Sequence, residues 1–96
     1  MYINLKFTMK NVAIIMGGYS SEYKISLTSG NVVFNNINRS KFNPYRIHIF
    51  KEKWVYVDEN DTEFPIDKND FSVTINGSKI NFDVVFNAIH GTPGED

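Results

Sequence analysis

The order of apolar and polar residues predicts that the chain opens with a buried strand followed by a helix. The run "NVAIIM" (11–16) ends at two glycines, which is typical of a short strand that is buried on both faces. In the next segment (23–37), apolar residues recur at helical spacing, at Ile25, Val32, Val33 and Ile37. Ser20 or Ser21 is placed to cap this helix. Because glycine costs a helix about 1 kcal/mol relative to alanine, we expect Gly30 to mark a close approach of the helix backbone to the first strand.

The middle of the chain reads as alternating turns and strands. Segment 38–44 has the polar and proline-containing composition of a turn, and "YRIHIF" (45–50) reads as a second strand. "WVYV" (54–57) predicts a further strand, and the acidic run at 58–61 predicts a solvated turn. That run lacks the glycine and the distal glutamate of a calcium loop.

A hairpin is indicated by the dipeptide Asn-Gly at 76–77, which favours a two-residue type I′ turn. Pairing the flanking residues across this turn places Val73 opposite Ile80. The same register places Phe71 opposite Phe82 on the same face. The alternation of side chains therefore supports the hairpin that the turn predicts.

The segment "DVVFNAI" (83–89) predicts another buried strand, within which Asn87 needs a hydrogen-bond partner. Strand, helix, strand, hairpin and strand together indicate an α/β domain, with a mainly parallel sheet, a flanking helix and an inserted hairpin. In open sheets of this kind, ligands bind beyond the carboxyl ends of the strands. If the first strand neighbours strand 83–89, the glycine-rich corners at 17–22 and 90–94 face each other across one crevice.

Composition narrows the class of protein. The chain has 96 residues, enough for one domain, and its 42% hydrophobic content favours a folded globule over a disordered segment. The net charge of −1 arises from mixed basic and acidic residues, which argues against nucleic acid and anionic membranes as partners. Cysteine is absent, which removes disulfides and thiolate metal sites.

No apolar run reaches the roughly 18 residues that a membrane helix needs. The first eight residues (1–8) do not resemble a signal peptide and are interpreted as a leader or expression remnant, with the natural sequence starting at Met9. We therefore expect a cytoplasmic protein whose single domain occupies 9–96.

The first candidate functional site is the corner "GGYSSE" (17–22). It lacks the third glycine of G-x-G-x-x-G and the G-K-[ST] of a P-loop, so it is a poor phosphate cradle. A carboxylate at Glu22, near a helix N-terminus and two hydroxyls, suits a ligand that bears an ammonium group. The alternative is that Glu22 only caps the helix, since acids in a first turn favour the helix dipole.

The second candidate is His90, which follows a strand and precedes a glycine. An imidazole there titrates near neutral pH and could exchange a proton or bind a substrate carboxylate. The alternative is a structural histidine with satisfied hydrogen bonds. His48 alternates with isoleucines and is expected to face outward. Glu95 and Asp96 are acids placed in what reads as the first turn of a helix, and alone they indicate no more than that.

Taken together, the two corners resemble the amino-terminal domain of D-alanine–D-alanine ligases. The first motif of that family, GG-x-S-x-E followed by an aliphatic residue, Ser, Leu and then Ser-Gly, is matched by Gly17, Gly18, Ser20, Glu22, Ile25, Ser26, Leu27, Ser29 and Gly30. The second, H-G-x-x-G-E-D, is matched by His90, Gly91, Gly94, Glu95 and Asp96. The resemblance spans 9–96, and it implies a Rossmann-like fold of the pre-ATP-grasp type.

The resemblance also implies roles for individual residues. Glu22 would bind the ammonium group of the first D-alanine, and Ile25 would line the pocket for its methyl group. Ser26 would belong to the same substrate-binding set. His90 would help to bind and orient the substrate, and Glu95 would join the hydrogen-bonded network behind it.

The family uses ATP and magnesium to join two D-alanines for peptidoglycan synthesis. Its ATP-grasp domain, with the phosphate-binding lysines and the magnesium ligands, is absent from this sequence. We therefore expect an incomplete domain that binds neither ATP nor a metal by itself and does not catalyse ligation alone. The resemblance also implies a homodimer in the intact enzyme. The alternative is a non-catalytic dimerisation or interaction module of flavodoxin-like fold.

Overall fold

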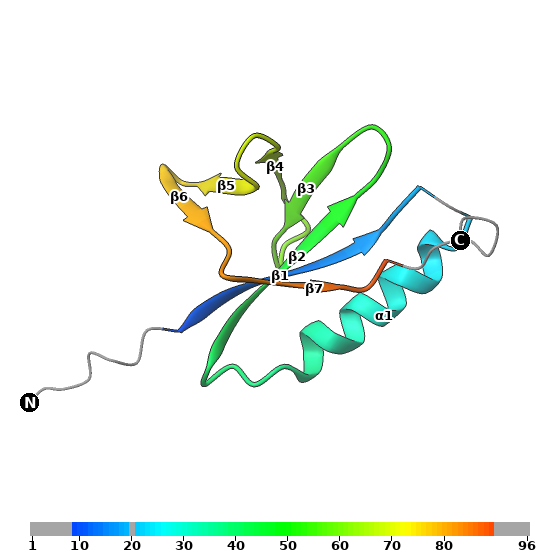
Figure 1. Ribbon diagram of the computed structural model, residues 1–96, viewed down its shortest axis with the longest axis horizontal. Helices are drawn as coiled ribbons and strands as arrows, with labels where there is room; N and C mark the ends of the chain where they lie inside the picture. The colour runs from blue at the N-terminus through cyan, green and yellow to red at the C-terminus, as the bar shows by residue number, and fades with distance from the viewer. Residues whose placement is uncertain (1–8, 20, 90–96) are drawn as a thin grey trace, which may run out of the picture.

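The computed structural model describes residues 9–19 and 21–89. Its elements, in chain order, are β1 (Lys10–Gly17), α1 (Tyr23–Asn36), β2 (Phe42–Ile49), β3 (Trp54–Val57), β4 (Glu63–Asp67), β5 (Ser72–Ile75), β6 (Ser78–Asn81) and β7 (Val84–Asn87). Figure 1 shows α1 alongside the parallel strands, while the antiparallel strands extend away from it.

The strands form one sheet in the order β6-β5-β4-β3-β2-β1-β7. β1 pairs in parallel with β2 on one side and β7 on the other, and the strands from β2 to β6 form an antiparallel meander. The predicted α/β class, with a flanking helix and a hairpin, is confirmed. The sheet is mixed rather than mainly parallel, because parallel pairing is confined to three strands.

β1 lies at the centre of the parallel part and is buried on both faces, as the sequence predicts. Ile14 and Met16 face α1, where they pack with Leu27 and Val33 of the helix. Ala13 faces the other side and joins a second core with residues of β2, β4 and β5. The strand therefore connects two hydrophobic layers.

The face that α1 buries differs from the predicted stripe. Ile25 and Val32 are 56% and 55% exposed, whereas Ser26 and Gly30 are buried against the sheet. Small residues let the helix backbone approach β1 closely, while Leu27 and Val33 pack on the core beside this contact. The helix begins after Glu22 at the N-cap position, so the predicted serine cap is wrong.

Two strands differ in extent from the sequence prediction. β2 begins at Phe42, inside the predicted turn, and includes Pro44. Proline is tolerated there because β3 pairs only with the later part of β2, from Arg46 onward, so the missing N–H faces no partner strand on that side. β4 was not predicted, and it extends the meander by one strand.

The predicted hairpin is confirmed in its register. Val73 pairs with Ile80 across β5 and β6, and both side chains join the core on the face opposite α1. Asn76 has a φ of 51° and the glycine after it a φ of 85°, as a type I′ turn requires. Phe71 and Phe82 lie beyond the paired residues, with ring centroids 5.5 Å apart.

β7 is the edge strand of the sheet, and the prediction that it is buried is wrong for the described chain. Val84, Val85 and Phe86 are 43%, 49% and 47% exposed. Asn87 is also exposed, and its Oδ1 accepts a hydrogen bond from the Ile89 amide at 2.9 Å. The apolar composition that predicted burial is present, but only β1 pairs with this strand.

Candidate functional site

The first glycine corner is held tightly against the end of β2. Gly17 and Gly18 both have φ of 103°, a conformation that residues with a side chain rarely adopt. A Cβ atom on Gly17 would lie 2.9 Å from the carbonyl oxygen of Ile49. The amide of Gly18 donates to that same oxygen at 2.6 Å. Glycine is therefore required for the backbone to turn away from the sheet at this point.

The second corner approaches the first through the residues that precede it. A Cβ atom on Gly18 would lie 2.9 Å from Cγ2 of Ile89, which is the residue immediately before His90. The amide of Ala88 donates to the carbonyl of Ile15 at 2.9 Å. Since β1 and β7 are neighbours, the chain leading into the second motif leaves the sheet beside the first glycine corner, as the sequence predicts.

The hydroxyl of Ser26 connects three elements at this place. Its Oγ accepts a hydrogen bond from the Gly17 amide at 2.9 Å and donates one to the Ala88 carbonyl at 2.7 Å. The side chain is fully buried. Sequence reasoning grouped Ser26 with the substrate-binding residues and did not predict this bridge. The signal that could have indicated it is a small polar residue one helical turn before Gly30, on the same helix face.

Glu22 occupies the N-cap position of α1. Its carbonyl oxygen accepts hydrogen bonds from the amides of Ile25 and Ser26, both at 3.1 Å. Its side chain makes no capping hydrogen bond to the helix. The alternative in which the Glu22 carboxylate serves as a helix cap is therefore not supported.

The remaining predicted site residues divide into two groups. Ile25 lies in the first turn of α1, with more than half of its surface exposed. His90 and Glu95 lie outside the described residues. The structure thus places Gly18 of the first motif beside Ile89, the residue before the second motif. The positions of the His90 and Glu95 side chains stay predictions.

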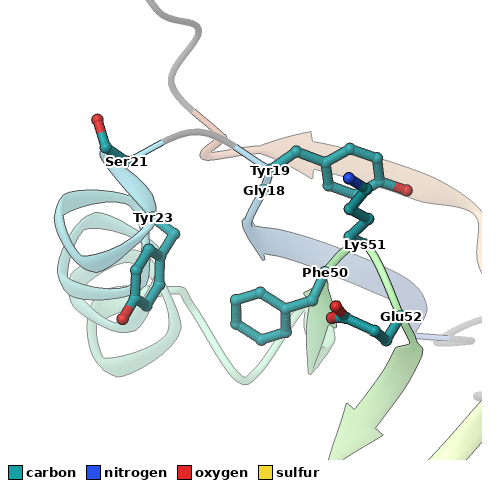
Figure 2. A pocket seen from close by; sticks show the side chains of 7 residues that line it. All are labelled: Gly18, Tyr19, Ser21, Tyr23, Phe50, Lys51 and Glu52. Carbon is teal, nitrogen blue, oxygen red and sulfur yellow. The ribbon is translucent and has the colours of Figure 1, made fainter.

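A cavity of about 490 Å³ opens between the N-terminus of α1 and the end of β2. Its lining residues are Gly18, Tyr19, Ser21, Tyr23, Phe50, Lys51 and Glu52. In Figure 2, the ring of Phe50 extends toward the ring of Tyr23 on α1; the two centroids are 5.9 Å apart and the rings meet edge-on at 80°. Neither aromatic residue was singled out from the sequence, because a hydrophobic pattern does not distinguish a cavity wall from a core.

His48 lies next to Phe50. It is on the face of the sheet that α1 covers, because its neighbours Ile47 and Ile49 belong to the core on the other face. Its ring is edge-on to the Phe50 ring at 6.0 Å, and its Nε2 atom is buried without a hydrogen-bond partner. The expectation that His48 faces outward is therefore wrong. Burial lowers the pKa of this imidazole below its usual value, and the positive charge of Arg46 lowers it further.

The Gly17–Glu22 segment itself contains no lysine, and Lys51 is the lysine in the lining of the neighbouring cavity. Among residues 9–19 and 21–89, no group of three or more acidic or imidazole side chains lies together in a way that could hold a metal ion. In the same part of the chain, no helix is long and apolar enough to cross a membrane.

The fold defines an α/β domain whose candidate site lies at the carboxyl ends of two neighbouring parallel strands, β1 and β7. A protein-family model described as the D-ala D-ala ligase N-terminus matches residues 11–96. The chain belongs to this family, and the resemblance inferred from its two motifs is confirmed.

Relatives and solved structures agree with this assignment. The chain is 78% identical over 88 residues to a D-alanine–D-alanine ligase of Flavobacterium johnsoniae, covering 92% of this chain and 27% of that protein. It is 54% identical over 87 residues to one of Christiangramia forsetii, covering 91% of this chain and 27% of that protein.

Among solved structures, a D-alanyl-alanine synthetase A from Vibrio cholerae matches with a TM-score of 0.70 at 30% identity, over 92% of this chain and 26% of that one. A D-Ala:D-Ser ligase from Enterococcus faecalis also matches with a TM-score of 0.70 at 30% identity, over 93% and 31% of the two chains. The chain thus spans about a quarter of the length of the curated relatives that it matches.

Proposed function

We propose that this chain forms the amino-terminal part of an ATP-dependent ligase that joins two D-alanines, and that it supplies part of the pocket for the first D-alanine. The observation that carries the proposal is the contact between Gly18 and Ile89, through which the first motif meets the chain leading into the second. A small zwitterion bound at this crevice would lie between an acidic group and an imidazole.

Each motif residue has a role in this proposal. The Glu22 carboxylate binds the substrate ammonium group from the N-terminal end of α1, next to the first glycine corner. Ile25 offers an exposed apolar surface to the methyl group. His90 orients the substrate and Glu95 supports the network behind it. Residues 9–96 form this substrate-binding part, and residues 1–8 stand outside it.

ATP and magnesium belong to the remaining length of the ligase in this proposal. Bound there, ATP would supply the phosphoryl group that activates the carboxylate of the first D-alanine for attack by the amine of the second, and magnesium would offset the negative charge of the phosphates. The residues of this chain hold and orient the first D-alanine while that occurs. The enzyme would act in the cytoplasm as a homodimer, in peptidoglycan synthesis, and its second amino acid would be selected by residues beyond this chain.

A hybrid ligase tests the proposal. Residues 9–96 replace the matching segment of the Flavobacterium johnsoniae ligase, to which they are 78% identical. With D-alanine, ATP and magnesium, the hybrid is expected to form D-alanyl-D-alanine and release phosphate, and the 96-residue chain alone is expected to form neither. A hybrid that folds but makes no dipeptide, beside an active parent enzyme, would contradict the proposal.

A further inference from the structure

The hydroxyl of Ser26 is unavailable to a ligand in this structure. The residue is fully buried. A serine hydroxyl has one hydrogen to donate, and Ser26 donates it to the carbonyl of Ala88 at 2.7 Å. Its oxygen accepts from the amide of Gly17 at 2.9 Å. Because both hydrogen bonds of the Ser26 hydroxyl go to the backbone, this side chain can affect a substrate only by fixing the positions of Gly17 and Ala88.

The three elements joined by this hydroxyl are those that carry the proposed substrate site. The amide of Ser26 donates to the carbonyl of Glu22, so the hydroxyl is fixed one helical turn from that residue. Gly17 is the last residue of β1, where the first corner begins. Ala88 lies two residues before His90 in the sequence.

Both backbone polar groups of Ala88, its amide and its carbonyl, are hydrogen-bonded. Its amide donates to the carbonyl of Ile15 in β1, and its carbonyl accepts from Ser26 in α1. The residue is itself buried. Beyond the end of β7, the path of the chain toward His90 is therefore fixed by one bond to the strand and one to the helix.

We propose that Ser26 is a positioning residue, which sets the separation between the Glu22 corner and the chain that enters the second motif. This inference rests on the proposed function, since the two corners are taken to bind one D-alanine. Removing the hydroxyl leaves a buried amide and a buried carbonyl without this partner, and both segments then relax to recover hydrogen bonds. A small displacement of that kind is enough to lower the rate of a positioned reaction about a hundredfold.

The same hybrid ligase provides the test, with kinetics measured separately for D-alanine at the first site and for ATP. In Ser26→Ala, kcat/KM for the first D-alanine is expected to fall roughly ten- to hundredfold, while KM for ATP stays within about twofold of the parent hybrid. Ser26→Cys nearly keeps the size but has only a weak donor, and it is expected to resemble Ser26→Ala. Ser26→Thr keeps the hydroxyl and is expected to recover part of the loss.

Val73→Ala serves as the matched control for stability. Val73 is buried in β5, in the core on the opposite face of the sheet from α1. Its truncation is expected to lower the unfolding temperature without changing KM for D-alanine. The inference is overturned if an active hybrid keeps its D-alanine kinetics in Ser26→Ala, or if Ser26→Thr and Ser26→Cys lose activity equally. An inactive unsubstituted hybrid would instead refute the proposed function.

Discussion

A Cβ atom placed on Gly30 of α1 would lie 2.8 Å from the Cβ, Sδ and Cε atoms of Met16 in β1. Real Cβ atoms do not approach other heavy atoms so closely, so the helix sits on the strand at a distance that only glycine permits. This contact explains why a residue unfavourable to helices lies in the middle of α1, and it was predicted from the sequence.

Gly30→Ala is therefore expected to destabilise the chain. Alanine improves helix propensity by about 1 kcal/mol, but overpacking a close contact costs about 1–3 kcal/mol. We expect a net loss of up to about 2 kcal/mol in the free energy of unfolding, measured with chemical denaturant. The control is Asn35→Ala at an exposed position of the same helix, which should be neutral or slightly stabilising. Equal stabilities of the two variants would contradict the packing of α1 on β1.

Gly77→Ala tests the hairpin turn. The residue has a φ of 85°, and a Cβ atom placed on it would meet nothing within 4 Å, so the cost is backbone strain alone. We expect a loss of about 1 kcal/mol in the free energy of unfolding, with faster amide exchange in β5 and β6. Thr74→Ala, at an exposed position of the same hairpin, is the control for a change in side chain alone. A Gly77→Ala chain as stable as the parent would argue against the type I′ turn.

The partly buried imidazole of His48 predicts that stability falls in mild acid. Its pKa in the folded chain is lowered from 6.5, first by burial and then by Arg46 and Lys53, against the opposite effects of Glu63 and Asp61. Below about pH 6.5 the unfolded chain therefore binds more protons at this residue than the folded chain, and stability decreases until the pH passes the lower, folded pKa.

The measurement is the free energy of unfolding between about pH 7.5 and roughly pH 5, compared between the parent chain and His48→Leu. The variant is expected to lose less stability on acidification. The carboxylate of Asp70 affects stability in a separate, more acidic pH range, because hydrogen bonds from Lys79 and Ser72 lower its pKa. The stability that Asp70 contributes is present above pH 3.8, the ordinary pKa of this carboxyl group. It is lost only as the pH falls through the lower pKa that Asp70 has in the folded chain. Identical pH profiles for parent and variant would contradict the burial of His48.

Glu22→Gln tests the ammonium site in the hybrid ligase. The substitution keeps the shape but removes the charge that we propose binds the substrate ammonium group, so KM for the first D-alanine is expected to rise at least about tenfold. Glu52→Gln, which also removes a carboxylate near this corner, is expected to leave KM unchanged. If both variants behave alike, Glu22 does not bind the ammonium group.

The features predicted correctly from the sequence are those determined by local chemistry. The Asn-Gly turn specified a hairpin because few other dipeptides adopt two positive φ values, and alternation then fixed the register of Val73 and Ile80. The apolar run of β1 specified a strand with two buried faces. Both signals are contained within a few neighbouring residues.

The features that were missed depend on tertiary contacts. The apolar stripe suggested that Ile25 and Val32 are buried, but the helix docks through Ser26 and Gly30, whose small size matters only against β1. β4 was not predicted, because proline and acidic residues such as those at 63–67 are uncommon in strands; β5 pairs only with residues beyond Pro65. The exposure of β7 depends on its place at the sheet edge, which its composition does not encode.

The two corner motifs predicted a candidate site, but they did not show how the first corner is built. The pairing of β1 with β7 was the condition under which the two corners would face each other, and the structure shows this pairing. The bridging hydroxyl of Ser26 and the aromatic walls at Tyr23 and Phe50 could not be predicted, because each depends on distances between elements that are far apart in the sequence.

The most direct test of the account is a crystal structure of the hybrid ligase with D-alanine bound. We expect one ammonium group on the Glu22 carboxylate and the His90 imidazole beside the same D-alanine molecule. D-alanine bound in another part of the enzyme, or the two side chains on opposite sides of the domain, would contradict it.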